Sequence, residues 1–299
     1  MSTAVPIDRE RPVTALTLRA MKSARRPIAM VTAYDASSAR LADSAGVDAI
    51  LVGDSLGMVV LGYDSTLPVT VDDVLRATAA VTRTVRRPLV IADMPFMSFQ
   101  VSAEEALRNA GRFVAEAGAQ AVKLEGGVRI AATVTRVVEA GIPVMGHLGL
   151  TPQSVNELGG YRVQGRESGP AAALIEDARA LEEAGAFGIV LECIPAELAA
   201  LVSAQIDIPT IGIGAGAGGD GQVQVFHDLL GLAGDFKPRH ARRYVDAGAI
   251  ITKALSEYVA DVRSGTVVTD EMCTSMDPRA LADVEAGAKR AKVRHTGKA

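Results

Sequence analysis

The stretch from Ala117 to Glu125 reads AGAQAVKLE and contains the unit from which the fold is built. An Ala-Gly pair follows a helical pattern, and a short apolar run then ends in an acidic residue. Glycine after the last turn of a helix accepts the left-handed backbone that ends the helix. The same arrangement occurs at Ala45-Gly46, Ala140-Gly141 and Ala184-Gly185. Repeated helix–strand units with nearly continuous apolar strands predict a parallel sheet buried on both faces.

Eight strands are expected along the chain, most of them separated by helical patterns such as 71–85, 103–116 and 171–183. Eight such units predict a closed (β/α)8 barrel, or TIM barrel, for which about 250 residues is usual. An open doubly wound sheet is the alternative, because the eighth strand could equally start a helix. The expected strands are 28–32, 49–53, 89–93, 121–125, 143–147, 188–192, 210–213 and 222–226.

The pattern divides the 299 residues into three parts. Residues 1–27 form an N-terminal lead-in with a short helix at 16–23, and 28–265 form the catalytic barrel. Within the barrel segment, 239–263 is typical of a long amphipathic helix or a helix pair. Residues 266–299 lack a core pattern and end in basic residues, so we expect a mobile C-terminal tail.

Composition excludes several classes of protein. A net charge of −4, 4% aromatic residues and no Trp argue against a nucleic-acid binder. The N-terminus has no secretory signal pattern, and no run of 18 apolar residues suggests a membrane span. Cys193 and Cys273 are too few for a disulfide framework, so a reducing, cytoplasmic location is expected.

Ionisable side chains gather at the C-terminal ends of consecutive expected strands. In a barrel these ends form one rim, where active sites lie. Lys123 and Glu125 are two residues apart on one strand and therefore point to the same side. The residues at the rim are Asp54 with Ser55, Asp93, Lys123 with Glu125, His147, and Glu192.

Asp54 and Asp93 end neighbouring strands, and Glu125 ends the next one. Carboxylates that face one point repel each other unless a cation or a proton lies between them. The chain has no HxxxH pair and no CxxC, so zinc is not indicated, whereas oxygen ligands favour Mg²⁺. The alternative is that each aspartate caps a following helix or turn.

Three further rim residues each allow more than one role. Lys123 lies inside an apolar strand, where it could hold a substrate carboxylate, act as a Schiff-base nucleophile, or pair with Glu125. His147 could donate to a substrate oxygen or be a structural histidine. Glu192, flanked by apolar residues, suits a general base, and the alternative is a helix cap. Its neighbour Cys193 is interpreted as a packing residue.

Two loops complete this interpretation. Residues 212–221 read GIGAGAGGDG and match the dinucleotide-binding fingerprint only weakly, so we expect a flexible loop. Residues 57–73 form a long loop on the same rim, which could be a lid or an oligomer contact.

Several blocks of sequence resemble the ketopantoate hydroxymethyltransferase family, and the similarity extends over about residues 14–265. The resemblance implies a TIM barrel of the phosphoenolpyruvate/pyruvate superfamily. It also implies Mg²⁺-dependent transfer of a hydroxymethyl group from 5,10-methylenetetrahydrofolate to 3-methyl-2-oxobutanoate, giving 2-dehydropantoate for pantothenate biosynthesis. Members commonly form homodecamers. The blocks are GDSLG (53–57), LGYDSTLPVT (61–70), ADMPF (92–96), AVKLEGG (121–127), GIPVMGHLGLTPQ (141–153) and GIVLECIP (188–195).

Carried onto this chain, the resemblance makes Asp54 and Asp93 metal ligands and Glu125 the third acid linked to the metal. Glu192 becomes the catalytic proton acceptor. Substrate contacts are expected from Asp54, Ser55, Asp93, Lys123 and His147. The segment after the barrel departs from the family pattern, so its contacts are left open.

Three rival functions remain. An isocitrate-lyase-like or phosphonomutase-like enzyme would share the metal and the enolate but need no folate, and its Cys-bearing lid motif is not found in the sequence. A Schiff-base aldolase would use Lys123. A barrel that serves only as a binding or assembly subunit would need none of the acidic rim.

Overall fold

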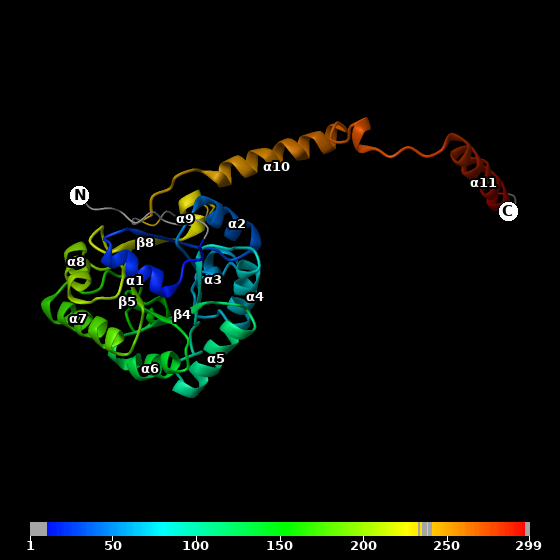
Figure 1. Ribbon diagram of the computed structural model, residues 1–299. Coiled ribbons are helices and arrows are strands. Elements are labelled where there is room, and N and C mark those ends of the chain that lie inside the picture. Colours follow the sequence, from blue (N-terminus) through cyan, green and yellow to red (C-terminus); the bar gives the residue numbers. More distant parts are fainter. Residues whose placement is uncertain (1–10, 233, 235–237, 239–240, 297–299) are drawn as a thin grey trace. The chain divides into compact units, whose positions relative to one another are not determined.

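Eight parallel strands close into a barrel in the order of the sequence, with β1 paired to both β2 and β8 (Figure 1). The computed structural model describes residues 11–232, 234, 238 and 241–296. The closed barrel confirms the expected fold and excludes the open sheet. The strands are β1 (Ile28–Thr32), β2 (Ala49–Val52), β3 (Leu89–Asp93), β4 (Ala121–Glu125), β5 (Val144–Gly149), β6 (Gly188–Glu192), β7 (Thr210–Ile213) and β8 (Gly221–Gln224).

Helices surround the barrel and connect its strands (Figure 1). The α-helices of the described residues are α1 (Ala15–Ser23), α2 (Ala36–Ala45), α3 (Leu56–Val59), α4 (Val71–Thr82), α5 (Ala103–Ala115), α6 (Ala131–Glu139), α7 (Ser168–Glu183), α8 (Ala196–Gln205), α9 (Phe226–Leu230), α10 (Ala247–Ser264) and α11 (Pro278–Thr296). Short 3-10 turns are η1 (Val128–Ile130), η2 (Pro152–Ser154) and η3 (Asp270–Met272).

Local sequence signals account for the element boundaries. Gly46 ends α2 in the left-handed conformation with a φ of 83°, as its position after the helix predicts. The Thr70 hydroxyl accepts a hydrogen bond from the backbone N–H of Asp73 and so caps α4. The eighth strand ends at Gln224, before its expected end at 226, because Phe226 already begins α9.

Alternating strand residues build two apolar layers. In β2, Leu51 packs in the barrel interior, whereas Ile50 packs between the sheet and the helices. Phe113 of α5 is fully buried in the outer layer. Because the sheet is covered on both faces, only the strand ends remain for a site.

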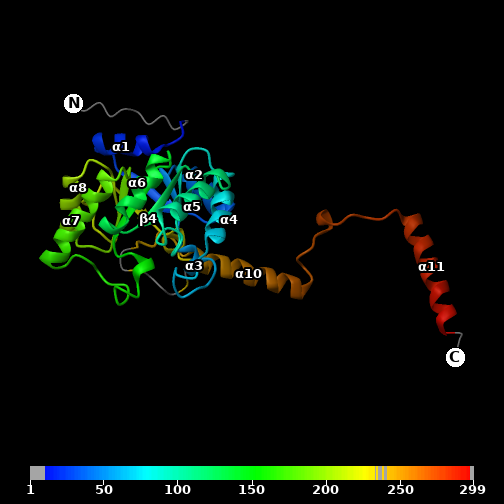
Figure 2. The same ribbon diagram turned by 90° about the horizontal axis from the view of Figure 1, so that it is seen from below.

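The helix α1 covers the N-terminal end of the barrel. Its side chains Leu18 and Met21 join the interior core, and Lys22 Nζ lies 2.9 Å from a carboxylate oxygen of Asp220. Figure 2 shows α1 at one end of the barrel and α3, which follows β2, at the other end. The C-terminal end of the strands is therefore the end available for chemistry.

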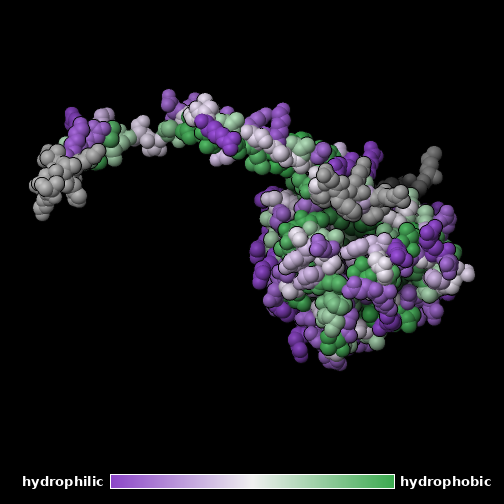
Figure 3. Space-filling model, turned by 180° about the vertical axis from the view of Figure 1, so that it is seen from behind, coloured by the Kyte–Doolittle hydropathy of each residue, from purple (hydrophilic) through white to green (hydrophobic). Residues whose placement is uncertain are grey.

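The chain divides into two compact units, one up to Asp246 and one from Ala247. This division differs from the expected limits of 28–265 for the barrel and 266–299 for the tail. The second unit begins with α10, which has no buried residue. Hydrophilic and hydrophobic residues are interspersed over the visible face of the barrel unit (Figure 3). In the described residues, no helix combines the length and apolarity that a membrane span requires.

Asp48, next to β2, joins three segments near the N-terminal end of the barrel. Its carboxylate lies 2.9 Å from Arg87 and 3.4 Å from Arg26, and it accepts a hydrogen bond from the backbone N–H of Ala29. We expect Asp48→Ala to lower the free energy of unfolding by about 3 kcal/mol, because it removes the carboxylate that pairs with Arg87 and Arg26. Urea unfolding measures the change.

The matched control is Glu157→Ala, which removes a pair with Arg129 whose side chains are 62% and 76% exposed. Such a surface pair contributes less than about 1 kcal/mol. Equal unfolding midpoints for the two variants would contradict the assignment of Asp48 as a structural anchor.

Candidate active site

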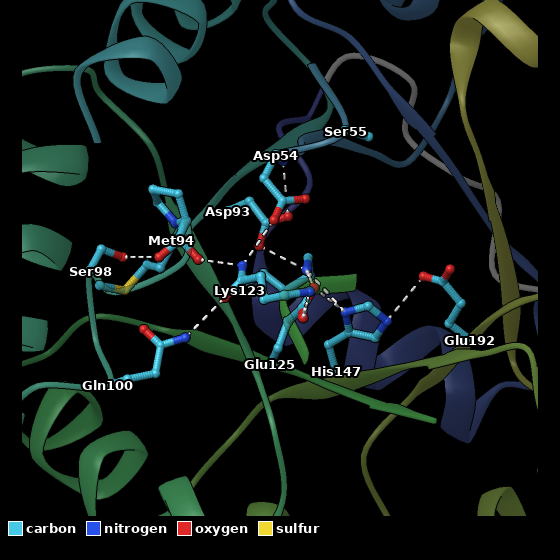
Figure 4. Close-up of polar contacts among 12 residues, drawn as sticks. Asp54, Ser55, Asp93, Met94, Ser98, Gln100, Lys123, Glu125, His147 and Glu192 are labelled. Atoms are coloured by element: carbon cyan, nitrogen blue, oxygen red, sulfur yellow. Dashed lines mark hydrogen bonds and ion pairs between the residues drawn. The ribbon is translucent and has the colours of Figure 1, made fainter. Parts of the chain in front are cut away.

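The predicted rim residues form one connected cluster at the C-terminal ends of β2 to β6 (Figure 4). Lys123 of β4 is at its centre, with Nζ 2.8 Å from Asp93 Oδ1 and 3.6 Å from Glu125 Oε1. Strand register explains the first contact, because Asp93 of β3 is directly paired with Lys123. The expected pairing of Lys123 with Glu125 is therefore present, and Asp93 is the closer partner.

Asp54 and Asp93 lie side by side at the ends of β2 and β3. The backbone N–H of Asp54 donates a hydrogen bond of 3.2 Å to Asp93 Oδ2. Neither carboxylate caps a helix: α3 begins after Ser55 and has no side-chain cap. The capping alternative for these two aspartates is thus not found.

A second line of contacts runs from Glu125 through His147 to Glu192. His147 of β5 is paired in register with Glu125, and its Nδ1 lies 3.1 Å from Glu125 Oε1. Its Nε2 lies 3.2 Å from Glu192 Oε2, as an ion pair. The imidazole therefore bridges the buried cluster and Glu192 (Figure 4).

Backbone contacts from both neighbouring strands fix the end of β6. The carbonyl oxygen of Glu192 accepts a hydrogen bond from Leu150 N, and the N–H of Cys193 donates to Ile213 O. Gly149 allows this approach, since a Cβ there would lie 2.2 Å from Glu192 O. Cys193 has a φ of 47°, in the left-handed region. Glu192 caps no helix, because α8 begins after Pro195 without a side-chain cap.

Burial and like charge raise the pKa of both aspartates. For Asp54, burial is the largest cause, and the charges of Asp93 and Glu125 add to it. For Asp93, burial and the charge of Glu125 outweigh the opposing effect of Lys123. The pKa of Glu125 is lowered instead, because His147 and Lys123 outweigh its burial. The uncompensated negative charge is therefore on the Asp54–Asp93 side.

The neighbouring carboxylates raise the pKa values of the two basic side chains, Lys123 and His147. Burial lowers the pKa of Lys123, but the charges of Asp93, Glu125 and Asp54 outweigh this and raise it above its usual value. Burial and the Lys123 charge lower the pKa of His147, yet Glu125 and Glu192 raise it to about 9. Both side chains are thus cationic at neutral pH.

Ser55 lies beside Asp54, and its hydroxyl oxygen is 2.8 Å from the hydroxyl of Tyr34, which follows β1. Tyr34 is buried, which raises the pKa of its phenol. The sequence interpretation included Ser55 but missed Tyr34. An aromatic residue directly after the first strand was the available signal.

Gln153 is the second residue that the sequence interpretation missed. It lies in η2, after β5, and its side-chain Nε2 donates to Asp54 Oδ2 at 2.9 Å. Its backbone N–H donates to Glu125 Oε2 at 3.0 Å. The residue is uncharged and lies beyond a strand end, so a search for ionisable groups at strand ends passes over it.

The donor set fits a hard divalent cation. Asp54 and Asp93 present carboxylate oxygens from adjacent strands. Burial raises the pKa of both, although Lys123 Nζ lies 2.8 Å from Asp93, so their ionised forms are incompletely stabilised. Mg²⁺ is commonly held by one or two carboxylates, with waters and substrate oxygens completing the octahedron. No group of three or more His, Cys, Asp or Glu side chains in the described residues forms a ready metal cage. Both carboxylate oxygens of Glu125 have hydrogen-bond partners, His147 and Gln153.

The chain is similar in sequence to known proteins over most of its length. The model of the family described as ketopantoate hydroxymethyltransferase matches residues 12–268. The chain is 57% identical over 272 residues to the 3-methyl-2-oxobutanoate hydroxymethyltransferase of Dehalococcoides mccartyi strain BAV1, covering 91% of this chain and 98% of that protein. It is 58% identical over 270 residues to the protein of the same name from Chloroflexus aurantiacus strain J-10-fl, covering 90% and 95%.

Solved structures with little sequence identity share the fold. A phosphonopyruvate hydrolase has a TM-score of 0.59 at 15% identity, covering 95% of this chain and 98% of that one. A 2,3-dimethylmalate lyase, described as a member of the PEP mutase/isocitrate lyase superfamily, has a TM-score of 0.55 at 18% identity, with the same coverage. These likenesses show that the chain shares the barrel fold with those proteins.

The raised pKa of His147 predicts a dependence of stability on pH. A group whose pKa rises from 6.5 to about 9 on folding stabilises the protein fully below pH 6.5, and loses that contribution as the pH rises through about 9. The contribution is about 3 kcal/mol at most. We expect the stability difference between the wild type and His147→Gln to shrink between pH 6 and pH 10.

Urea unfolding without added divalent ions, over that pH range, measures this difference. The chain has four histidines, so the loss of one NMR signal in His147→Gln assigns the wild-type resonance for direct titration. A stability difference that stays constant with pH, or a His147 titration midpoint near 6.5, would show that the carboxylates do not stabilise the protonated imidazole.

Proposed function

The chain belongs to the ketopantoate hydroxymethyltransferase family, and on that premise we propose that it transfers a hydroxymethyl group from 5,10-methylenetetrahydrofolate to 3-methyl-2-oxobutanoate. The product is 2-dehydropantoate, a precursor of pantothenate. The observation that carries the proposal is the rim cluster, in which an acidic pair and a separate carboxylate, Glu192, lie on either side of Lys123 and His147. This arrangement suits removal of a proton next to a keto group.

Asp54 and Asp93 would hold Mg²⁺ through their carboxylates, and Glu125 would support it indirectly, since both of its oxygens have partners. When bound, the ion supplies Lewis acidity that polarises the keto group of a 2-oxo acid. Ser55, next to Asp54, offers a hydroxyl for the substrate carboxylate. These residues bind and orient the oxo acid.

Glu192 would accept the proton from C3 of the oxo acid. It is the most accessible carboxylate of the cluster, with 18% of its side chain exposed, against 2% for Asp93 and Glu125. His147 Nε2 holds one of its oxygens at 3.2 Å. A general base must reach the proton that it removes, and a carboxylate at the mouth of the barrel does so.

Loss of the C3 proton leaves an enolate, whose C3 forms a new bond to the one-carbon unit of the folate. With one water consumed, the products are 2-dehydropantoate and tetrahydrofolate, so the atoms balance. The folate carries the carbon, and the protein provides orientation and electrostatic stabilisation. The Lys123 ammonium, held close to the acidic pair, contributes positive charge next to the developing oxyanion.

The geometry disfavours a Schiff-base aldolase. A lysine nucleophile must lose its proton, which requires a lowered pKa. The carboxylates around Lys123 raise its pKa instead. The ammonium is therefore an electrostatic partner, and no reaction step uses it as a nucleophile.

We also propose that the chain acts as a homo-oligomer in the cytoplasm, with a decamer as the expected state. The family resemblance motivates the assembly, and the low cysteine content motivates the compartment. Light scattering after size-exclusion chromatography tests the assembly, and a monomer would contradict it.

The proposal predicts a turnover that depends on both the folate and the metal. The purified protein, incubated with 3-methyl-2-oxobutanoate, 5,10-methylenetetrahydrofolate and Mg²⁺, should yield a product heavier by one CH₂O unit in mass spectrometry. EDTA should abolish the product, and excess Mg²⁺ should restore it. No product in the complete mixture would contradict the transfer and favour a lyase-type reaction, and product that persists in EDTA would refute the metal dependence.

The role of Glu192 gives a second prediction. Glu192→Gln keeps the shape of the side chain but removes its ability to take a proton, so we expect kcat to fall by about 10²–10⁴-fold. Exchange of the C3 proton for deuterium, followed by NMR without folate, should slow by a similar factor. Unchanged exchange would assign the proton transfer to another group.

A further inference from the structure

Gln153 is positioned by four hydrogen bonds that join three strand ends to one loop. Its side-chain Nε2 donates to Asp54 Oδ2 at 2.9 Å and to the carbonyl oxygen of Met94 at 2.9 Å. Its Oε1 accepts from Gln100 Nε2 at 3.1 Å. Its backbone N–H donates to Glu125 Oε2. Gln153 is only 5% exposed, so water does not readily replace these partners.

Only a primary amide satisfies this set of partners. The NH₂ group supplies two donors, which face a carboxylate oxygen and a carbonyl oxygen, and the amide oxygen supplies the acceptor that faces Gln100. A glutamate at this position would present oxygen to oxygen at two of these contacts. An apolar side chain would leave the buried Met94 carbonyl and one oxygen of Asp54 without donors, which costs free energy.

The side chain of Gln153 contacts Asp54, which is the carboxylate whose negative charge is least offset by neighbouring cations. Asp93 has Lys123 at 2.8 Å, and Glu125 has His147 at 3.1 Å. Among the described contacts of the Asp54 carboxylate, the donor is Gln153. The amide fixes the rotation of this carboxylate while leaving its negative charge in place, which is what a cation ligand requires.

We propose that Gln153 is a positioning residue that orients the Asp54 carboxylate for a divalent cation. Gln100, in the loop after β3, in turn orients the side chain of Gln153. The inference rests on the proposed function, because it assumes that Asp54 and Asp93 bind the cation. Gln153 does not touch the cation itself. Hydrogen-bond partners of this kind typically change metal affinity by about 10–100-fold when they are removed.

The test uses Mn²⁺ alone as the probe, on the full chain without either substrate. The EPR signal of free Mn²⁺ gives the dissociation constant for the wild type and for Gln153→Met. Methionine is close to glutamine in length and keeps the backbone N–H that holds Glu125, so the change is confined to the side-chain contacts. We expect the dissociation constant to rise by about 10–100-fold.

Two further variants separate positioning from general damage. Gln120→Met removes another side-chain hydrogen bond, from Val90 N to Gln120 Oε1, at the start of β3 and away from the rim. It should leave Mn²⁺ affinity unchanged. Gln100→Met removes the outer contact with Gln153 and a 3.4 Å hydrogen bond from the backbone N–H of Phe99, at an exposed position. It should therefore fold and weaken Mn²⁺ binding less than Gln153→Met does.

Turnover supplies a second readout that a merely structural role would not move. In Gln153→Met, the Mg²⁺ concentration for half-maximal turnover should rise by the same factor as the Mn²⁺ dissociation constant. At saturating Mg²⁺, kcat should recover to within a few-fold of the wild-type value, because excess cation offsets the lost orientation.

Each outcome decides between the two proposals. If the wild type binds Mn²⁺ and both Gln153→Met and Gln100→Met bind it equally well, the positioning role is overturned and the proposed function stands. If the wild type binds no Mn²⁺, the metal site in the proposed function fails, and this inference fails with it. If Gln153→Met does not fold, unchanged affinity in Gln100→Met overturns the proposal, and weakened affinity supports it.

Discussion

The charge balance of one buried cluster constrains the whole active end of the barrel. Asp54, Asp93 and Glu125 bring three carboxylates into a space that excludes water, and Lys123 and His147 bring two cations. A buried charge without a partner costs free energy, and each of the two cations lies next to carboxylates whose negative charge it offsets. Glu125 is fully compensated, and its pKa is lowered, whereas the pKa values of the aspartates are raised. Under the proposed function, a divalent cation beside Asp54 and Asp93 would offset this cost.

Strand register produces this balance. In a parallel barrel, paired residues on adjacent strands lie next to each other, and alternate residues share a side. Asp93 is paired with Lys123, and Glu125 is paired with His147. The two spacings together place a cation beside each of two carboxylates. Side chains on strands are more rigidly held than side chains on loops, so the cluster keeps its geometry without a ligand.

Much of this was predictable from the sequence, because the signals were local. The Ala-Gly pairs and the apolar runs predicted the strands, and the acidic or basic residue at each strand end predicted the rim. Three features were not predictable by the same reasoning. The preference of Lys123 for Asp93 depends on register. The roles of Gln153 and Tyr34 depend on contacts between distant segments. The lack of buried residues in α10 does not follow from its amphipathic pattern alone.

The cluster also combines closely paired buried charges with one carboxylate that is more exposed, Glu192. Lys123, Asp93 and Glu125 have side chains that are at most 3% exposed, and each has a charged partner, so changing their protonation would disturb several contacts at once. Glu192 is linked to them only through His147, and 18% of its side chain is exposed. The contacts that hold Asp93, Lys123 and Glu125 together therefore do not depend directly on the protonation of Glu192. Under the proposed function, this arrangement would let Glu192 take up a proton while Asp54 and Asp93 keep their positions.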